Sequence, residues 1–205
     1  MQWRIENQLI EYKYALEFME QRVRGIIDNS AEELVWLLEH PELYTAGISA
    51  SNQELKEIYN IPVFHVSRGG KFTYHGPGQR IIYLMLDLNK RGKDVKKFVY
   101  QMEQWIITSL AAFELNCFRK KDYIGIWCKD DQGKDVKIAA IGVKLKKWVS
   151  YHGIAINVNP NLEYFNGIIP CGIENYEITS LKKLAINIEL KELDEQLLQS
   201  FSNFF

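Results

Sequence analysis

The sequence predicts a single domain of mixed α/β or α+β class, because helical and strand-like patterns alternate along a chain of 205 residues. This length supports one sizeable hydrophobic core and is short for two. The sequence contains no internal repeat, low-complexity tract or Pro/Ser-rich linker. The whole range 1–205 is therefore expected to form one domain.

The first expected elements are a helix and a strand. Apolar side chains recur close to a 3.6-residue period over residues 7–27, beginning at Leu9, and the pattern stops at Asp28. Residues 33–47 begin as a short buried strand, and Pro41 marks a turn within them. These patterns predict a helix followed by strand structure on both sides of that turn.

A short helix and two further strands are expected next. Ser51 followed three residues later by Glu54 is a possible capping box, which predicts a helix that ends near Asn60. Two apolar, strand-like runs follow at residues 61–66 and 80–88. The glycine-rich stretch between these runs is expected to be a loop.

The second half of the chain predicts a long helix followed by antiparallel strands. Asp94 can cap a helix that runs to about Glu114, since its apolar positions follow steps of three and four. Residues 123–158 contain three β-rich runs, with hairpin turns expected at residues 130–133 and near Lys146.

The C-terminal part is expected to contain a loop and a last helix. Residues 159–173 are punctuated by proline and glycine, which is typical of a loop. Asp194 is a candidate for the first residue of the C-terminal helix.

Charge and hydropathy exclude several classes of function. The chain has 25 Lys plus Arg and 26 Asp plus Glu, so no global field points to nucleic acid or membrane as the main partner. The N-terminus lacks the order of charged, apolar and small residues of a signal peptide, and no apolar run approaches the roughly 18 residues of a spanning helix. These features predict a cytoplasmic protein.

The three cysteines need individual explanations. They are odd in number and widely spaced, and none forms a CxxC pair, which argues against a disulfide framework and a structural zinc site. Cys117 and Cys128 lie beside apolar segments and are expected to pack in the core or at its edge. Cys171 lies between Pro170 and Gly172, so its context allows either a nucleophile or a small buried residue in a turn.

The stretch RGGKFTYHGPGQ, residues 68–79, is the densest cluster of glycines in the chain. It matches neither the G-x-x-x-x-G-K-[ST] phosphate loop nor the dinucleotide fingerprint. His75 could join His65 or His152 in a metal site, but no carboxylate or cysteine lies at ligand spacing, so no metal is expected. Glycines do allow the backbone to approach a ligand closely.

Three segments in this order, RGGKFTYHGPGQ, KIAAIGVKLKKWVSYHGIAINV and IIPCGI, resemble the lipoyl-protein octanoyltransferases of the biotin/lipoate protein ligase-like superfamily. The resemblance spans Arg68 to Ile173 and implies one catalytic domain with mixed β-sheets and flanking helices. It implies transfer of octanoyl from acyl carrier protein to a lysine of lipoyl domains, the first step of endogenous lipoate biosynthesis, without a cofactor. The implied acceptors are 2-oxoacid dehydrogenase complexes and the glycine cleavage H protein.

The resemblance assigns catalysis to Cys171 and Lys137, which are 171 − 137 = 34 residues apart. A thiol with a pKa near 8.5 needs a neighbouring cation to ionise at neutral pH. Lys144 is the rival cation, but it lies an odd interval of seven residues from Lys137. In an unbroken strand the two lysines would face opposite sides of the sheet, although a β-bulge at Gly142 would weaken this argument.

The resemblance also implies an acyl-binding pocket with three walls, in which small residues leave room for an alkyl chain. The implied substrate-binding residues are Arg68, Gly69, Gly70, Lys71, Phe72, Thr73, Tyr74, His75, Ala140, Ile141, Gly142, Gly153, Ile154 and Ala155. For any single glycine, ordinary turn chemistry is the alternative, and Phe72 and Tyr74 could equally be core aromatics.

Partner recognition and reaction class leave alternatives open. Lysines at 96–97, 144–147 and 182–183 could face acidic partner proteins or simply be solvated. Arg80 stands where the family usually has leucine, and residues 44–47 depart from its usual YTLG. An ATP-dependent lipoate or biotin ligase and a non-catalytic acyl-binding relative are the competing functions, and the PCG motif favours the transferase.

Overall fold

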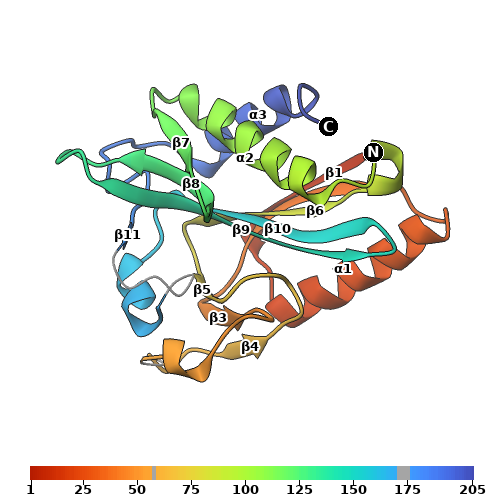
Figure 1. Ribbon diagram of the computed structural model, residues 1–205, viewed down its shortest axis with the longest axis horizontal. Coiled ribbons are helices and arrows are strands. Elements are labelled where there is room, and N and C mark those ends of the chain that lie inside the picture. The colour runs from red at the N-terminus through yellow and green to blue at the C-terminus, as the bar shows by residue number, and fades with distance from the viewer. Residues whose placement is uncertain (57–58, 170–175) are drawn as a thin grey trace.

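The computed structural model describes residues 1–56, 59–169 and 176–205. Its centre is an eight-stranded mixed sheet with helices on both faces (Figure 1). Seven strands follow the order β1 (Gln2–Leu9), β2 (Leu34–Glu39), β6 (Gln79–Met85), β10 (Val149–Asn157), β9 (Asp135–Lys146), β8 (Tyr123–Lys129) and β7 (Cys117–Lys120), and β11 (Glu177–Ile178) pairs with β9. The β1–β2 and β11–β9 pairs are parallel, and the others are antiparallel.

A second, three-stranded sheet lies below the central one in Figure 1 and has the order β4 (Val63–His65), β3 (Leu43–Ala46) and β5 (Phe72–His75). The prediction that residues 68–79 form only a loop is wrong, because β5 lies within them and pairs with β3. Phe72 and Tyr74 are buried on alternate positions of this strand. A four-residue strand between glycines is too short for its period to stand out.

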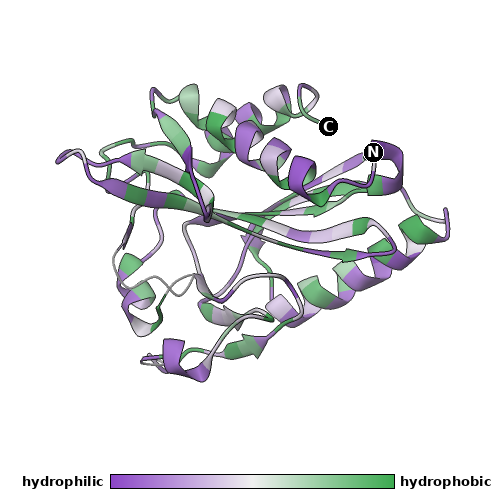
Figure 2. Cartoon of the chain, viewed as in Figure 1, coloured by the Kyte–Doolittle hydropathy of each residue, from purple (hydrophilic) through white to green (hydrophobic). Residues whose placement is uncertain are grey.

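Three α-helices complete the layers: α1 (Tyr12–Ile27), α2 (Val95–Ala111) and α3 (Leu190–Phe201). Helix α1 and the small sheet lie on one side of the central sheet, and α2 and α3 lie on the other (Figure 1). Helices α1 and α2 carry hydrophobic and hydrophilic residues alternately along their length (Figure 2), as expected for helices with one buried face. No helix among the described residues is long and apolar enough to cross a membrane.

Two helix starts differ from the prediction. Residues 7–9 belong to β1, and the side chain of Leu9 is 46% exposed, so it does not continue the apolar face of α1. Helix α3 begins at Leu190 behind a capping box formed by Glu189 and Glu192. Asp194 therefore lies inside α3, where it pairs with Arg80 and does not cap the helix.

Other boundaries follow from local chemistry. The side chain of Asp94 accepts a hydrogen bond from the Lys97 backbone amide at 2.9 Å, which confirms it as the cap of α2. The Ser51–Glu54 capping box is also present, but its helix, η1 (Asn52–Glu54), stops well before residue 60. Two further 3₁₀ helices are η2 (Leu88–Arg91) and η3 (Leu162–Gly167), and η3 lies in the segment predicted to be a loop.

Hydrophobic residues fill both sides of the central sheet. One core lies under α2 and α3 and includes Leu84, Met102 and Trp105. The other lies under α1 and includes Met19, Trp36 and Ile81. Strands β6 and β10 are buried along their whole length, so they form a rigid platform beside the small sheet.

Candidate active site

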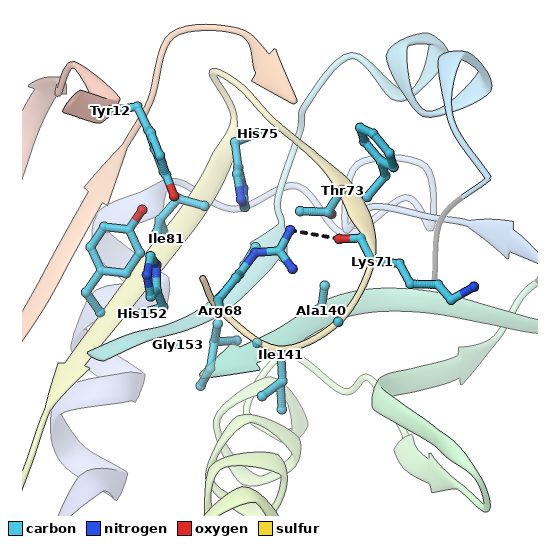
Figure 3. A pocket seen from close by; sticks show the side chains of 16 residues that line it. Tyr12, Arg68, Lys71, Thr73, His75, Ile81, Ala140, Ile141, His152 and Gly153 are labelled. Atoms are coloured by element: carbon cyan, nitrogen blue, oxygen red, sulfur yellow. Dashed lines mark hydrogen bonds between the residues drawn. The ribbon is translucent and has the colours of Figure 1, made fainter. Parts of the chain in front are cut away.

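A pocket opens between the segment around β5 and the neighbouring strands β9 and β10 (Figure 3). It encloses about 550 Å³ when its open mouth is included. Its lining residues are Tyr12, Arg68, Gly70, Lys71, Phe72, Thr73, His75, Ile81, Tyr83, Ala140, Ile141, Gly142, His152, Gly153, Ile154 and Ala155. A lining that combines apolar residues with a few polar groups is typical of a site for a small organic group.

The structure brings together all the substrate-binding residues that the sequence suggested, except Gly69 and Tyr74. The Gly69 amide donates to the Val143 carbonyl at 3.1 Å, which joins its loop to β9. Tyr74 lies in a separate cluster and stacks on Tyr164, with ring centroids 5.1 Å apart. Binding of an acyl chain by the lining residues remains a prediction.

Four lining residues were missed: Tyr12, Ile81, Tyr83 and His152. Tyr12 comes from the first turn of α1, and Ile81 and Tyr83 come from β6. From sequence alone, Ile81 and Tyr83 cannot be distinguished from ordinary core residues of an apolar strand. His152 directly precedes the predicted wall residue Gly153, so it was the easiest of the four to suspect.

The glycines of β9 and β10 bring the pocket walls together. A Cβ at Gly142 would lie 3.2 Å from both Arg68 Cδ and the Gly69 carbonyl oxygen, and one at Gly153 would lie 2.1 Å from the Ile82 carbonyl oxygen. The space left by these glycines is thus occupied by Arg68 and β6. This differs from the expected role of leaving room for an alkyl chain.

Arg68 is buried and ties the loop before β5 to its surroundings. Its guanidinium donates to the carbonyl oxygens of Gly69, Thr45 and Lys71 at 2.9, 3.0 and 3.1 Å. It also donates to the Thr45 hydroxyl at 2.6 Å. A buried guanidinium needs several such acceptors, and these bonds fix the position of the loop.

Gln79 orients His75 through its side-chain amide. The amide oxygen lies 2.6 Å from His75 Nδ1, and the amide nitrogen donates to Asn157 Oδ1 at 2.8 Å. An amide oxygen only accepts, so Nδ1 of His75 carries the proton. Burial lowers the pKa of His75 to about 3, and it is neutral at physiological pH.

A second buried histidine, His40, holds Tyr83 at the pocket wall. His40 Nδ1 lies 2.5 Å from the Ile10 carbonyl oxygen, so Nδ1 donates. Burial lowers the pKa of His40 to about 4, and its neutral ring leaves Nε2 as an acceptor. The Tyr83 hydroxyl, 2.7 Å from this nitrogen, must then donate to it.

Lys137 is buried and lies beside the pocket, outside its own lining. It lines a smaller adjoining cavity together with Thr73, Ala140 and Ala155, three residues that also line the main pocket. Its Nζ is 5.6 Å from the centre of the Trp127 ring. An amine at this distance from an aromatic face makes a cation–π contact.

Cys171, the predicted nucleophile, lies outside the described residues. The first described residue after it is Tyr176, whose ring centre is 5.8 Å from Lys137 Nζ. The rings of Tyr176 and Trp127 are in edge contact, with centroids 4.9 Å apart. Lys137 therefore lies next to Tyr176, which is five residues after Cys171 in the sequence.

The prediction that Lys137 and Lys144 face opposite sides of the sheet is wrong. Ile126 pairs with Ala139 while the next residue, Trp127, pairs with Lys137, so β9 contains a bulge between these two positions. Val136, Ile138, Ala139, Ile141, Val143 and Leu145 all pack in the core on the α2 side. The bulge thus places both lysines on the pocket side, and Lys144 there donates to the Ser67 hydroxyl.

The remaining cysteines are packing residues, as expected. Cys117 and Cys128 are opposite each other across β7 and β8. Burial raises the pKa of Cys117 to about 12 and that of Cys128 to about 11, so both remain thiols at neutral pH. The described part of the chain contains no cluster of three or more His, Cys, Asp or Glu that could hold a metal ion.

The fold and pocket define a lipoate-ligase-like catalytic domain. The family described as lipoyl protein ligase A/B catalytic domain matches residues 11–202, so the chain belongs to it. A bipartite lipoate protein ligase from Thermoplasma acidophilum has a TM-score of 0.72 at 16% identity, with 100% of this chain and 84% of that chain covered. Lipoate-protein ligase A bound with ATP gives 0.73 at 14% identity, with 100% and 85% covered. These two similarities confirm the mixed α/β fold.

Relatives of higher identity narrow the assignment. The chain is 50% identical to the octanoyltransferase of Wolbachia pipientis wMel over 205 residues, which cover 100% of this chain and 99% of the relative. It is 46% identical to the octanoyltransferase of Bartonella henselae over 213 residues, which cover 100% and 87%. Within the family, the chain belongs to the octanoyltransferases.

Proposed function

We propose that this protein transfers an octanoyl group from the thioester of acyl carrier protein to a lysine amine of a lipoyl domain, through a thioester on Cys171. Octanoyl transfer follows from membership of the octanoyltransferases. The observation that supports the rest is the position of Lys137, which is buried in a small cavity that shares Thr73, Ala140 and Ala155 with the pocket. The carrier-bound donor and the covalent step are our inference.

The pocket lining suits a saturated chain. Ile81 on β6, Ala140 on β9 and Ala155 on β10 are the aliphatic lining residues on the pocket side of the sheet. Burying the seven carbons beyond an octanoyl carbonyl contributes at most about 5–6 kcal/mol, at roughly 0.8 kcal/mol per methylene, before the entropy of binding is subtracted. That energy is enough to hold the chain while its carbonyl reacts.

The proposed reaction is two successive acyl transfers. The Cys171 thiolate attacks the donor carbonyl, a new thioester forms on Cys171, and the carrier thiolate leaves. The acceptor amine then attacks this thioester, an amide forms, and the Cys171 thiolate leaves. Neither step changes oxidation state, and the energy of the thioester bond drives amide formation, so no nucleotide or other cofactor is required.

Lys137 has two roles in this scheme. Its ammonium lowers the pKa of the Cys171 thiol, because a nearby positive charge favours the thiolate. The ammonium can also give a proton to the departing carrier thiolate, and the neutral amine formed in that step can accept a proton from the attacking lysine. Its position beside Tyr176, five residues after Cys171 in the chain, supports this pairing.

The proposed partners are octanoyl-acyl carrier protein as donor, and the lipoyl domains of 2-oxoacid dehydrogenase complexes and the glycine cleavage H protein as acceptors. This reaction would begin endogenous lipoate synthesis, and its partners imply action in the cytoplasm. We expect neither nucleic acid nor membrane to take part.

The decisive test is transfer without nucleotide. Purified protein, octanoyl-acyl carrier protein and a lipoyl domain should give an octanoylated lipoyl-domain lysine by intact-mass measurement and peptide mapping. A requirement for ATP, magnesium and free octanoate would instead identify a ligase, the reaction class named for the ATP-bound structural relative.

The covalent step has its own test. Incubation with the donor alone should add one octanoyl group, released by hydroxylamine and located on the Cys171 peptide. Cys128→Ala is a matched control, because this buried thiol is expected to leave acylation intact. Full turnover by Cys171→Ala, or a label on Cys117 or Cys128, would exclude the proposed intermediate.

A further inference from the structure

The end of the pocket opposite Lys137 is closed by three polar aromatic side chains, Tyr12, Tyr83 and His152, here called the far wall. In Figure 3, Tyr12, Ile81 and His152 lie on one side of Arg68, and Thr73 and Ala140 lie on the other. Thr73, Ala140 and Ala155 are the residues shared with the Lys137 cavity. The pocket therefore has a reactive end at these shared residues and a closed end at the far wall.

The length between the two ends matches an eight-carbon chain. Along β10, Ala155 at the reactive end and His152 at the far wall are three residues apart, which is roughly 10 Å at about 3.3 Å per residue. Seven carbon–carbon bonds in an extended zigzag advance about 9 Å, given bonds near 1.5 Å and angles near 111°. A tail with two to four more carbons would meet the far wall.

The far wall is held rigidly from behind. Tyr83 donates to His40, and His40 donates to the Ile10 carbonyl oxygen. The ring of Tyr12 lies edge-on to His40 with centroids 5.2 Å apart, and His152 stacks on Tyr151 at 5.2 Å. Each side chain thus has a packed or hydrogen-bonded partner that resists displacement.

The far wall also offers a longer tail no polar contact in compensation for steric overlap. Nε2 of His152 is buried and has no hydrogen-bond partner among the described residues. The Tyr83 hydroxyl proton is committed to His40, so its oxygen can only accept further bonds. A longer tail that reached the Tyr83 oxygen would gain no hydrogen bond there, so nothing at the far wall offsets the steric limit.

We propose that Tyr12, Tyr83 and His152 set the acyl chain length by stopping the tail at eight carbons. These side chains determine specificity and take no part in the chemistry. The inference rests on the proposed function, since it assumes that the acyl tail enters this pocket with its carbonyl at the Lys137 end.

The test measures kcat/KM for hexanoyl-, octanoyl-, decanoyl- and dodecanoyl-acyl carrier protein with a lipoyl domain. Tyr12→Ala shortens one part of the far wall. His152→Gly removes a second side chain of the far wall, at a residue whose φ of 60° suits glycine. Either variant should raise the ratio of dodecanoyl to octanoyl kcat/KM at least about tenfold, since methylene-sized changes in an apolar pocket alter specificity by 10-fold or more. Tyr14→Ala, at an exposed position of the same helix, is the matched control and should keep the wild-type ratio.

The ratio is measured within one preparation, so partial unfolding of a variant does not change it. If both variants transfer acyl groups with the wild-type ratio of dodecanoyl to octanoyl kcat/KM, the far wall does not limit acyl chain length, and the proposed function stands. If the wild-type protein transfers no acyl group from the carrier, the proposed function itself has failed. A shift toward longer chains in the Tyr14→Ala control would also overturn the inference, because the effect would not be specific to the wall.

Discussion

The ion pair between Arg80 on β6 and Asp194 on α3 predicts a large and pH-dependent stabilisation. Arg80 Nη2 lies 2.8 Å from Asp194 Oδ2, and the two side chains are only 2% and 6% exposed. Arg80→Leu replaces the guanidinium with an apolar side chain. The substitution leaves the Asp194 carboxylate buried without its cation.

The size of the effect can be bounded from the protonation of Asp194. At pH 7.5 the variant can neutralise the unpaired Asp194 carboxylate by binding a proton. In the folded wild type the pKa of Asp194 is about 6, so protonating this carboxyl at pH 7.5 costs the variant about (7.5 − 6) × 1.36, or roughly 2 kcal/mol, relative to wild type, and the lost bonds to Arg80 add to this cost. Measured losses for breaking one half of a buried pair are about 3–5 kcal/mol. We expect Arg80→Leu to lower the free energy of unfolding by about that amount at pH 7.5.

At lower pH the cost should fall. Burial raises the pKa of Asp194 to about 6, although Arg80 acts in the opposite direction. Because the folded-state pKa exceeds the unfolded value, folding takes up a proton between about pH 4 and pH 6. This group therefore favours the folded state most at low pH, and the contribution is lost as the pH rises through 6. At pH 5 the wild-type carboxyl is itself mostly protonated, so the protonation cost of Arg80→Leu falls below about 0.5 kcal/mol.

Urea unfolding of four proteins at pH 7.5 and pH 5 measures both effects. The set is wild type, Arg80→Leu, Asp194→Leu and the double variant. The double variant should lie within about 2 kcal/mol of wild type, because replacing a whole buried pair with apolar groups is often neutral or stabilising. A cost below about 1 kcal/mol for Arg80→Leu at pH 7.5, or an equal cost at both pH values, would refute the reasoning.

Three further predictions concern the thiol and its lysine. In Lys137→Ala, the midpoint pH of Cys171 alkylation by iodoacetamide should rise and acyl transfer should collapse, whereas Lys144→Ala should change neither; the reverse pattern would reassign the catalytic lysine. Gly125→Ala should raise the same midpoint and slow transfer about tenfold or more, because a Cβ there would lie 2.4 Å from Lys137 Cε; unchanged kinetics in a folded variant would contradict this. Cys128 should react at pH 7.5 far more slowly than Cys171, since burial raises its pKa to about 11, and peptide mass spectrometry that finds equal rates would disprove the difference.

Sequence periodicity predicted the elements that are long and have one buried face. Helix α2 followed from steps of three and four with Asp94 as its cap, and the hairpin strands followed from turn residues. Strand β5 was missed because four residues between glycines carry too little pattern. Asp194 was misread because a carboxylate near a helix start resembles a cap, while its partner, Arg80, is 114 residues away.

The pocket was predictable only in part. Most residues of its walls belong to motifs within continuous segments of the chain, so the sequence could identify them. Tyr12 enters from α1, which precedes every motif, and only the packing of α1 below the sheet brings it there. The orientation of His75 depends on Gln79 and Asn157, a chain of contacts that crosses from β5 to β10.

The β9 bulge changes how the two lysines must be distinguished. An odd interval of seven residues places two side chains on opposite faces only in an unbroken strand. One extra residue between Lys137 and Ala139 puts Lys137 and Lys144 on the same face. Both lysines then face the pocket side, so their surroundings decide between them. Lys137 is buried beside Trp127 and adjoins the reactive end, whereas Lys144 is half-buried, donates to Ser67 and lies near Tyr151. Of the two lysines, only Lys137 is both buried and close to Tyr176, which follows Cys171 in the sequence. Burial strengthens the electrostatic effect of its charge on a nearby thiol, because water screens that charge less.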